Sequence, residues 1–199
     1  GPASEYSSPV QLPGTDWVKG VAGQGTMWYL KNNGTLWGAG RNSFGQLGQN
    51  SISSPANNGL SSPVQIPGTT WSTGDKKFSS SSYNTTHGIK TDGTLWSWGS
   101  GNIGQGGYND ILSRSSPTQI PGTTWSKISS GQAATVAIKT DGTLWSWGNN
   151  TQGHLGLNQG PAGDYSSPVQ IPGTTWKDVY VNTYYSTTAL KTDGTLWMW

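Results

Sequence analysis

The sequence has no cysteine, and this absence removes several kinds of chemistry at once. A chain without thiols forms no disulfide, has no thiolate nucleophile and offers no cysteine ligand to a metal. Charge is also scarce, because 10% of the 199 residues are Asp, Glu, Lys or Arg and the formal net charge is +2. The eleven Lys and Arg are spread almost singly and form no basic stripe, so we expect no nucleic-acid partner.

Long apolar runs are missing as well. No stretch approaches the ~18 residues of a membrane-spanning helix, and the chain does not open on a signal-peptide pattern. We therefore expect no membrane insertion. Both ends fall inside the repeat pattern described below, which leaves open that a signal peptide or fused domains belong to the protein.

Glycine and aromatic residues are abundant instead. Thirty Gly and eleven Pro, together with frequent Ser, Thr and Asn, favour many short strands joined by turns. Low hydrophobicity with low charge is also typical of disordered chains, but twelve Trp and eight Tyr supply large apolar surfaces that such chains lack. The composition predicts an all-β protein with an aromatic core.

One phrase recurs and divides the chain into four units. "SSPVQLPG" at Ser7 returns with small changes at Ser61, Ser115 and Ser166, at spacings of 54, 54 and 51 residues. Each copy is followed by a tryptophan and then by a hairpin phrase such as "KTDGTLWSWG". Periods of this length are typical of propellers and solenoids. We predict a single repeat domain over 1–199, with units at about 1–55, 56–109, 110–160 and 161–199.

Alternation and turn residues predict four strands in the third unit. "SPTQI" comes first and is stopped by a Pro-Gly turn; "WSKISS", "TVAIKT" and "TLWSWG" follow. Asp141 and Gly142 form the two-residue loop favoured in tight hairpins, where both positions need a positive φ. Four antiparallel strands per ~50 residues indicate propeller blades. We predict a β-propeller of four such blades, either a complete four-bladed ring or part of a larger propeller.

Tryptophans recur at positions that indicate packing between blades. The period of two in "TLWSWG" places Trp145 and Trp147 on the same side of the sheet. Ala39 replaces the second of these tryptophans in the first unit, where Trp28 is a candidate to compensate. We assign a structural role in the blade core to Trp17, Trp37, Trp71, Trp96, Trp98, Trp125, Trp145, Trp147, Trp176 and Trp197.

Two stretches carry a family resemblance. "ISSGQAATVAIKTDGTLWSWGNNTQGHLG" at 128–156 and "AGQGTMWYLKNNGTLWGAGRNSFGQLG" at 22–48 run from a small-residue strand through a hairpin to a loop ending in "GQLG" or a close variant. They resemble repeats of the regulator of chromosome condensation family. The resemblance implies a propeller, usually of seven blades, that acts as a rigid platform for protein partners. The cysteine-free style is similar to bacterial and bacteriophage members, which implies an extracellular or virion-surface protein.

The loops divide into two classes. In an up-and-down blade, successive connections alternate between the two ends of the strands, so the Pro-Gly and Asp-Gly turns share one face. Those turns are nearly identical in all units, whereas the opposite loops differ in each, from "SSYNTT" to "NTYYST". Loops also drift without a function, but variation confined to one face is how repeat proteins build a binding surface.

We predict that this variable face binds a protein or a carbohydrate. Tyrosine rings stack on either kind of partner, and amides supply paired donors and acceptors. The predicted contact residues are Arg41, Phe44, Tyr83, Asn84, Tyr108, Asn109, Asp110, Asn149, Gln152, His154, Tyr184 and Tyr185.

We expect no enzyme, no cofactor and no metal site. The three Asp-Gly turns account for one third of the nine acidic residues, and the others show no pairing in neighbouring units. His87 and His154 occupy different positions in their units, and two histidines alone would leave a metal site incomplete. "GSGNIG" matches a dinucleotide motif by letter only, because no helix follows it.

The function predicted from these patterns is a non-enzymatic recognition module on a bacterial cell surface or virion. An alternative is a structural subunit that associates through blade edges, because unpaired strands invite association and four units are fewer than seven. Self-association is then expected if the propeller is incomplete. A further alternative, implied by the family's eukaryotic founder, is nucleotide exchange on a small GTPase.

Overall fold

The computed structural model describes residues 9, 11–53, 59–132, 134–158, 163–182 and 186–199. These residues form fifteen strands and no helix. The strands are β1 (Trp17–Ala22), β2 (Thr26–Lys31), β3 (Leu36–Gly40), β4 (Leu60–Ile66), β5 (Phe78–Ser80), β6 (Thr85–Ile89), β7 (Leu95–Gly99), β8 (Arg114–Gln119), β9 (Trp125–Ser130), β10 (Ala134–Lys139), β11 (Leu144–Gly148), β12 (Tyr165–Ile171), β13 (Trp176–Val181), β14 (Thr187–Lys191) and β15 (Leu196–Met198).

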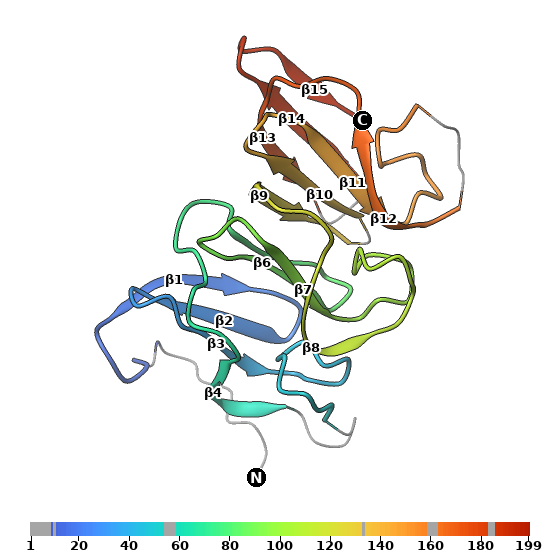
Figure 1. Ribbon diagram of the computed structural model, residues 1–199. Coiled ribbons are helices and arrows are strands. Elements are labelled where there is room, and N and C mark those ends of the chain that lie inside the picture. The colour runs from blue at the N-terminus through green and yellow to red at the C-terminus, as the bar shows by residue number, and fades with distance from the viewer. Residues whose placement is uncertain (1–8, 10, 54–58, 133, 159–162, 183–185) are drawn as a thin grey trace.

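The strands form four antiparallel sheets arranged along an arc (Figure 1). Sheet 1 contains β1 to β4, sheet 2 contains β5 to β8, sheet 3 contains β9 to β12, and sheet 4 contains β13 to β15. Within each sheet, neighbours in space are neighbours in the chain. Sheets 1 and 4 lie at opposite ends of the arc, which does not close into a ring. The prediction of an all-β, blade-built fold is confirmed.

The assignment of strands to blades was wrong in one respect. The "SSPTQ" segment forms β8, which pairs with β7 of the preceding unit, with Trp96 opposite Gln119 and Ser97 opposite Thr118. In the same way, β4 pairs with β3 and β12 pairs with β11, each in the sheet of the preceding unit. Alternation predicts that a strand exists but not which neighbour it joins. Each of the first three sheets therefore ends on such a strand, and sheet 4 has three strands instead of the predicted four.

Apolar cores fill the spaces between adjacent sheets. Between sheets 2 and 3, Ile89 and Leu95 of one sheet pack against Trp125 and Trp147 of the next. Similar clusters join sheets 1 and 2 and sheets 3 and 4. A buried indole removes about 200 Å² from water, worth about 5 kcal/mol at 25 cal/mol per Å². Tryptophan packing is therefore a major part of what holds the arc together.

Trp28 does not fill the place left by Ala39. Ala39 pairs with Met27, whereas Trp28 pairs with Gly38, so the two side chains lie on opposite faces of sheet 1. Trp28 instead packs against Phe78 of sheet 2, at a ring separation of 5.7 Å. The face of sheet 1 that points away from sheet 2 therefore lacks the second tryptophan.

The hairpin turns differ from the predicted two-residue type. Gly142 has φ 78, but Asp141 is not among the residues with positive φ. Gly142 N donates to Lys139 O at 3.0 Å, which makes a turn of four residues with a left-handed glycine at its end. Asp141 Oδ1 accepts bonds from Thr143 N and Oγ1 at 3.0 and 2.7 Å. Asp141 therefore stabilises the turn through its carboxylate, and its backbone does not adopt the positive φ that was predicted.

Candidate binding face

The two faces of the arc are separated as the strand order predicts. Each of the three Pro-Gly links between adjacent sheets runs over the Asp-Gly or Asn-Gly turn of the sheet before it. Trp71 N donates to Gly34 O at 3.0 Å, and Trp125 N donates to Gly93 O at 2.9 Å. These turns and links therefore form one continuous surface. The remaining connections, which include 23–25, 41–53, 81–84, 100–113 and 149–158, lie at the other strand ends and are called the variable face.

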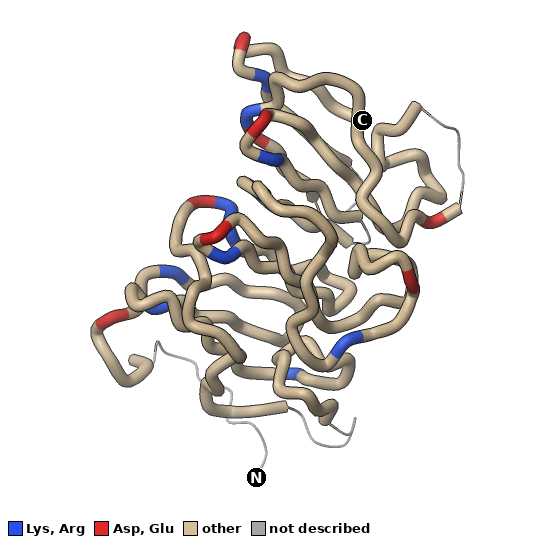
Figure 2. The backbone as a smooth tube through the Cα atoms, in the orientation of Figure 1, with Lys and Arg blue, Asp and Glu red and all other residues tan. Residues whose placement is uncertain are grey.

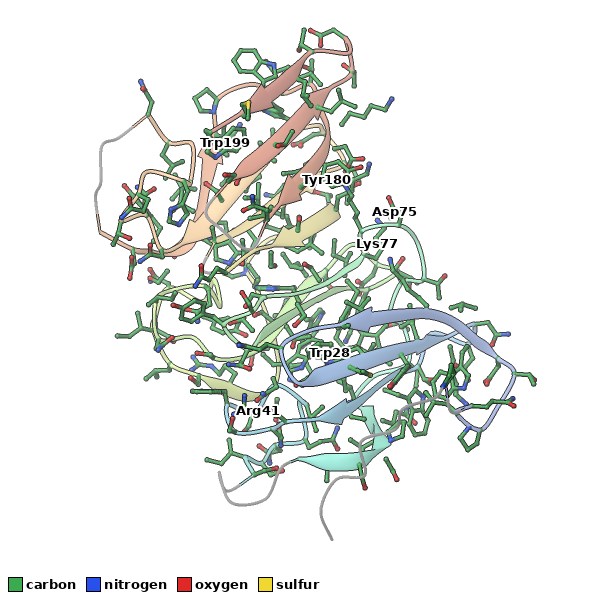
Figure 3. All side chains as sticks on the ribbon, turned by 180° about the vertical axis from the view of Figure 1, so that it is seen from behind. Trp28, Arg41, Asp75, Lys77, Tyr180 and Trp199 are labelled. Atoms are coloured by element: carbon green, nitrogen blue, oxygen red, sulfur yellow. The ribbon has the colours of Figure 1, made fainter. Side chains whose placement is uncertain are left out.

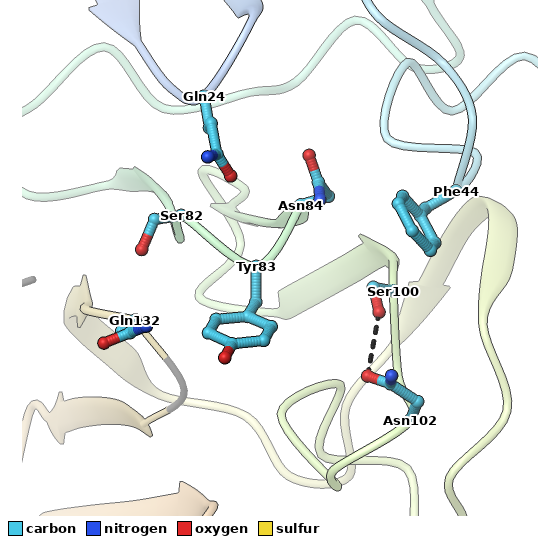
Figure 4. A pocket seen from close by; sticks show the side chains of 8 residues that line it. All are labelled: Gln24, Phe44, Ser82, Tyr83, Asn84, Ser100, Asn102 and Gln132. Carbon is cyan, nitrogen blue, oxygen red and sulfur yellow. Dashed lines mark hydrogen bonds between the residues drawn. The ribbon is translucent and has the colours of Figure 1, made fainter. Parts of the chain in front are cut away.

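An open hollow of about 410 Å³ lies on the variable face, between loops of sheets 1, 2 and 3 (Figure 4). Two aromatic rings line it: Phe44 is 43% exposed and Tyr83 is 39% exposed. The described lining residues carry no charge, and besides the two rings they are Gln24, Ser82, Asn84, Ser100, Asn102 and Gln132. The hollow therefore combines rings that can stack with neutral donors and acceptors.

A buried glutamine holds the lining loops in place. Gln46 is fully buried, and its Oε1 accepts a bond from Phe44 N at 2.9 Å. Its Nε2 donates to Asn84 Oδ1 at 3.3 Å, in the next sheet. Gln105 repeats the arrangement one unit later, because its Oε1 accepts from Ile103 N at 2.9 Å. Sequence reasoning missed this positioning role, although the Gly-Gln pair shared by "GQLG" at 45–48 and "GQGG" at 104–107 is a signal for it.

The structure brings three of the predicted contact residues together. Phe44, Tyr83 and Asn84 all line the hollow, although they come from two different sheets. Asn84 has φ 60, a left-handed conformation that asparagine tolerates better than most residues. Arg41 is exposed at the start of the sheet 1 loop, where its side chain lies over Gly25 (Figure 3).

Three further predicted residues, at 108–110, make contacts within the protein itself. The Tyr108 ring packs against the core between sheets 2 and 3, and burial raises the pKa of its phenol. Asp110 forms an ion pair with Arg114 at 2.6 Å. Asn109 N donates to Ser166 O at 2.7 Å, across to sheet 3. These contacts give the segment a role in packing and loop shape.

The remaining predicted residues are divided. Asn149 donates to Asp164 Oδ1 at 2.8 Å, which closes its own loop, while Gln152 is exposed. His154 is buried in the position of Gln46 and Gln105, and this burial lowers its pKa. Tyr184 and Tyr185 lie outside the described residues.

The described residues contain no group of three or more His, Cys, Asp or Glu that could hold a metal ion. No described segment forms a helix with the length and apolarity that crossing a membrane requires. The one large pKa shift at a histidine concerns His87, which lies between sheets 2 and 3 and away from the hollow lining. The lining of the hollow offers neutral hydrogen bonding and aromatic contact.

Comparison with known families identifies the repeat. Models of the regulator of chromosome condensation (RCC1) repeat match residues 92–138 and 141–181, and a second model of that repeat matches 125–153. Residues 92–181 therefore match RCC1 repeats, and the chain is RCC1-like. The predicted resemblance is confirmed, whereas the bacterial or bacteriophage type stays a prediction. No curated protein matches the sequence closely enough to count as a relative.

Solved structures show the RCC1 fold over 96% of the chain. Human WBSCR16 is 20% identical, with a TM-score of 0.80 over 96% of this chain and 50% of that one. Yeast RCC1 (Prp20), solved bound to Kap60, is 19% identical, with a TM-score of 0.77 over 96% of this chain and 45% of that one. The RCC1-like arc therefore spans about half the length of these propellers.

Proposed function

We propose that this RCC1-like arc is a non-enzymatic recognition module that binds a protein partner at the hollow on the variable face. The observation that carries the proposal is the pair of exposed rings, Phe44 and Tyr83, in a concave site between three sheets. Six of the twelve tryptophans are buried, whereas Phe44 and Tyr83 keep exposed rings that a partner can reach. Aromatic anchors in hollows are the residues that most often dominate binding energy.

The shape of the hollow supports a preorganised site. Gln46 fixes the Phe44 backbone and the Asn84 side chain at the same time, which lowers the entropy lost when a partner binds. Proteins of the same fold also support a protein partner. Yeast RCC1 was solved bound to Kap60, and the yeast protein Prp20p is described by its binding to Gsp1p and histones.

Binding to arrayed purified bacterial surface proteins tests the proposal, with a glycan array run in parallel. We expect binding to a protein that Phe44→Ala with Tyr83→Ala weakens about 30-fold, the effect of losing a hot spot of ~2 kcal/mol. Both rings are half exposed, so we expect the melting temperature to stay unchanged.

The matched control replaces two exposed apolar residues of the same face outside the hollow, Ile111→Ala with Leu112→Ala. We expect it to bind like the parent chain. Binding that survives the Phe44 and Tyr83 changes contradicts the proposed site. A signal confined to the glycan array, and lost in the same variant, contradicts the protein partner and assigns the hollow to a carbohydrate.

A further inference from the structure

The outer edge of sheet 4 is exposed where the other sheets are covered. In sheets 1 to 3, the strand equivalent to β15 pairs with a fourth strand, whereas β15 pairs only with β14 among the described residues. Leu196 of β15 is 69% exposed, although its equivalents Leu36, Leu95 and Leu144 are at most 1% exposed. Met198 is 80% exposed. Sheet 4 therefore presents an unpaired edge and an apolar face that the repeat normally buries.

The opposite end of the arc presents the matching surface. Trp17 follows a Pro-Gly turn like three buried tryptophans, yet it stays partly exposed on the outer face of sheet 1. Val18, next to Trp17 in the chain, is exposed, and so is Met27 at the other end of the β1–β2 pair. At Gly20, where the repeat elsewhere places Ile128 and Val179 in the core between sheets, an added Cβ would meet nothing within 4 Å.

The strand that sheet 4 lacks is encoded elsewhere in the chain. Strands β4, β8 and β12 all contain the phrase "SSP", followed by Val or Thr and by Gln. A fourth copy, "SSPVQL", occupies 7–12 and immediately precedes sheet 1. Its described residues Pro9, Gln11 and Leu12 belong to no strand of this arc. The chain thus has one more copy of this phrase than the sheets of the described residues contain.

The spacing of the chain determines where that strand would sit. Five positions separate Leu12 from Trp17, as they separate Ile66 from Trp71 at the joint between sheets 1 and 2. A strand at 7–12 must therefore lie in a sheet packed on the outer face of sheet 1. Sheet 4 of the same chain lies at the far end of the arc, so a second copy of the chain presents a sheet that this strand can join (Figure 1).

We propose that two copies of the chain close head to tail into one ring, each giving 7–12 as the fourth strand of the other's sheet 4. The arc spans about half the length of the RCC1-like chains it matches, and two arcs of four sheets give a ring of eight sheets, one more than the seven blades usual in the family. A head-to-tail contact used twice closes with twofold symmetry. The register of β3 with β4 places Leu12 opposite Leu196 and Gln11 opposite Trp197.

The hairpin turn of sheet 4 has open space where the proposed contact between copies needs it. At the other joints, the turn glycine accepts a bond from the next tryptophan, and a Cβ on Gly34 or Gly142 would clash with the link above it. The equivalent Gly194 has nothing within 4 Å of that position. A Pro-Gly link from the second copy fills this space and brings Trp17 N toward Gly194 O.

The test is the mass of the 199-residue chain in solution, measured by light scattering after gel filtration. We expect twice the chain mass of 21.1 kDa. Leu196→Asp should give a monomer, because a carboxylate then faces the joint. Leu112→Asp is the matched control: this leucine is 60% exposed away from both ends of the arc, and the variant should stay dimeric.

A second test removes residues 1–12, which leaves all fifteen strands in place. The shortened chain should be monomeric and should bind a synthetic peptide "EYSSPVQLPG", but not the same peptide with Val10 and Leu12 replaced by Asp. A monomeric or polymeric parent chain overturns the proposal, as does a dimer that persists in both altered chains. The Phe44 and Tyr83 variant should stay dimeric, which separates this proposal from the function of the hollow.

Discussion

The two tryptophans of one "LWSW" strand donate their indole N–H groups to acceptors in different parts of the fold. Trp147 Nε1 donates to Gln105 O at 3.0 Å, in a loop of the preceding sheet. Trp145 Nε1 donates to Thr143 Oγ1 at 2.9 Å, in its own hairpin. Trp199 repeats the first arrangement by donating to His154 O at 2.9 Å. The second tryptophan therefore joins adjacent sheets, while the first stabilises a turn.

His87 shares the carbonyl that Trp147 uses. The imidazole is fully buried, with Nε2 3.1 Å from Gln105 O and Nδ1 3.1 Å from Ser130 Oγ. A carbonyl only accepts, so Nε2 carries the proton and Nδ1 accepts from the serine. Burial lowers the pKa of His87 to about 4, against the weaker opposing effect of the bond to Gln105. The histidine is thus a neutral part of the core between sheets 2 and 3.

We predict that stability falls as the pH drops from 6.5 toward 4. The unfolded chain takes up a proton on this histidine near pH 6.5, whereas the folded chain resists it down to about pH 4. Stability from the neutral imidazole is therefore fully present above pH 6.5 and is lost through that window. The loss amounts to about 3 kcal/mol. Urea unfolding at a series of pH values measures it.

His87→Val, which copies Val136 of the next unit, should flatten this dependence. Burial lowers the pKa of His154 too, so the comparison is made in a His154→Gln background, which copies the other loops. The turn aspartates have lowered pKa values and change charge below this window. An equal slope with valine at position 87 would assign the pH dependence to another group.

At the scale of elements, the turn and the link that covers it act as one unit. Trp176 N donates to Gly142 O at 3.0 Å, and a Cβ on Gly142 would lie 2.2 Å from Thr174 O in that link. The glycine is therefore required twice, for its positive φ and for the close approach of the next sheet. This second requirement explains why the turn face is nearly identical in every unit.

We predict that Gly142→Ala destabilises the fold by more than about 3 kcal/mol. The left-handed conformation costs a non-glycine residue about 1–2 kcal/mol, and the clash with backbone adds to it. Gly122→Ala is the control, because Gly122 also has positive φ but has only side-chain atoms nearby, at 3.6 Å or more. Denaturant unfolding of both variants measures the difference. Equal losses would show that the link moves freely away from the turn.

The strands and the division of faces were predictable, because period-two alternation and strand parity are local properties. The partner of "SSPTQ" was not, since either neighbouring sheet offers an edge with the same sequence pattern. The hollow was predictable in part: Phe44 and Tyr83 differ from their counterparts in other units, but the role of Gln46 depends on a contact with Asn84, 38 positions away. Such contacts depend on how adjacent sheets pack, and the sequence of a single strand does not predict them.

At the scale of the whole molecule, sheets 2 and 4 are connected directly across sheet 3. Seven positions separate Trp71 from Phe78, against three between Trp125 and Ile128, so unit two has a longer loop here. The loop places Lys76 beside sheet 4, where its ammonium lies 2.9 Å from the centre of the Tyr180 ring. Figure 3 shows Tyr180 next to this loop, on an arc whose charges are otherwise sparse (Figure 2).

An ion cluster strengthens this connection. Lys76 Nζ lies 2.5 Å from Asp178 Oδ1 and donates to Val179 O at 2.8 Å. Lys127 of sheet 3 lies 3.4 Å from the same carboxylate. Burial alone raises the pKa of Asp178, but the hydrogen bonds from Lys76 and the Val179 amide, with both lysine charges, outweigh it and lower the pKa. Groups from three sheets therefore meet at one point.

We predict that Lys76→Met loosens sheet 4 and lowers the free energy of unfolding by about 2 kcal/mol, because an almost buried carboxylate loses its main partner. Lys177→Met is the control, since Lys177 is exposed on β13 beside the cluster. Hydrogen exchange should show faster opening of β13 and β14 in the first variant and no change in the second. Lys127 stays in place, so it limits the loss. If sheet 4 exchanges equally slowly in both variants, tryptophan packing alone sets the curvature of the arc, and the cluster is a consequence of it.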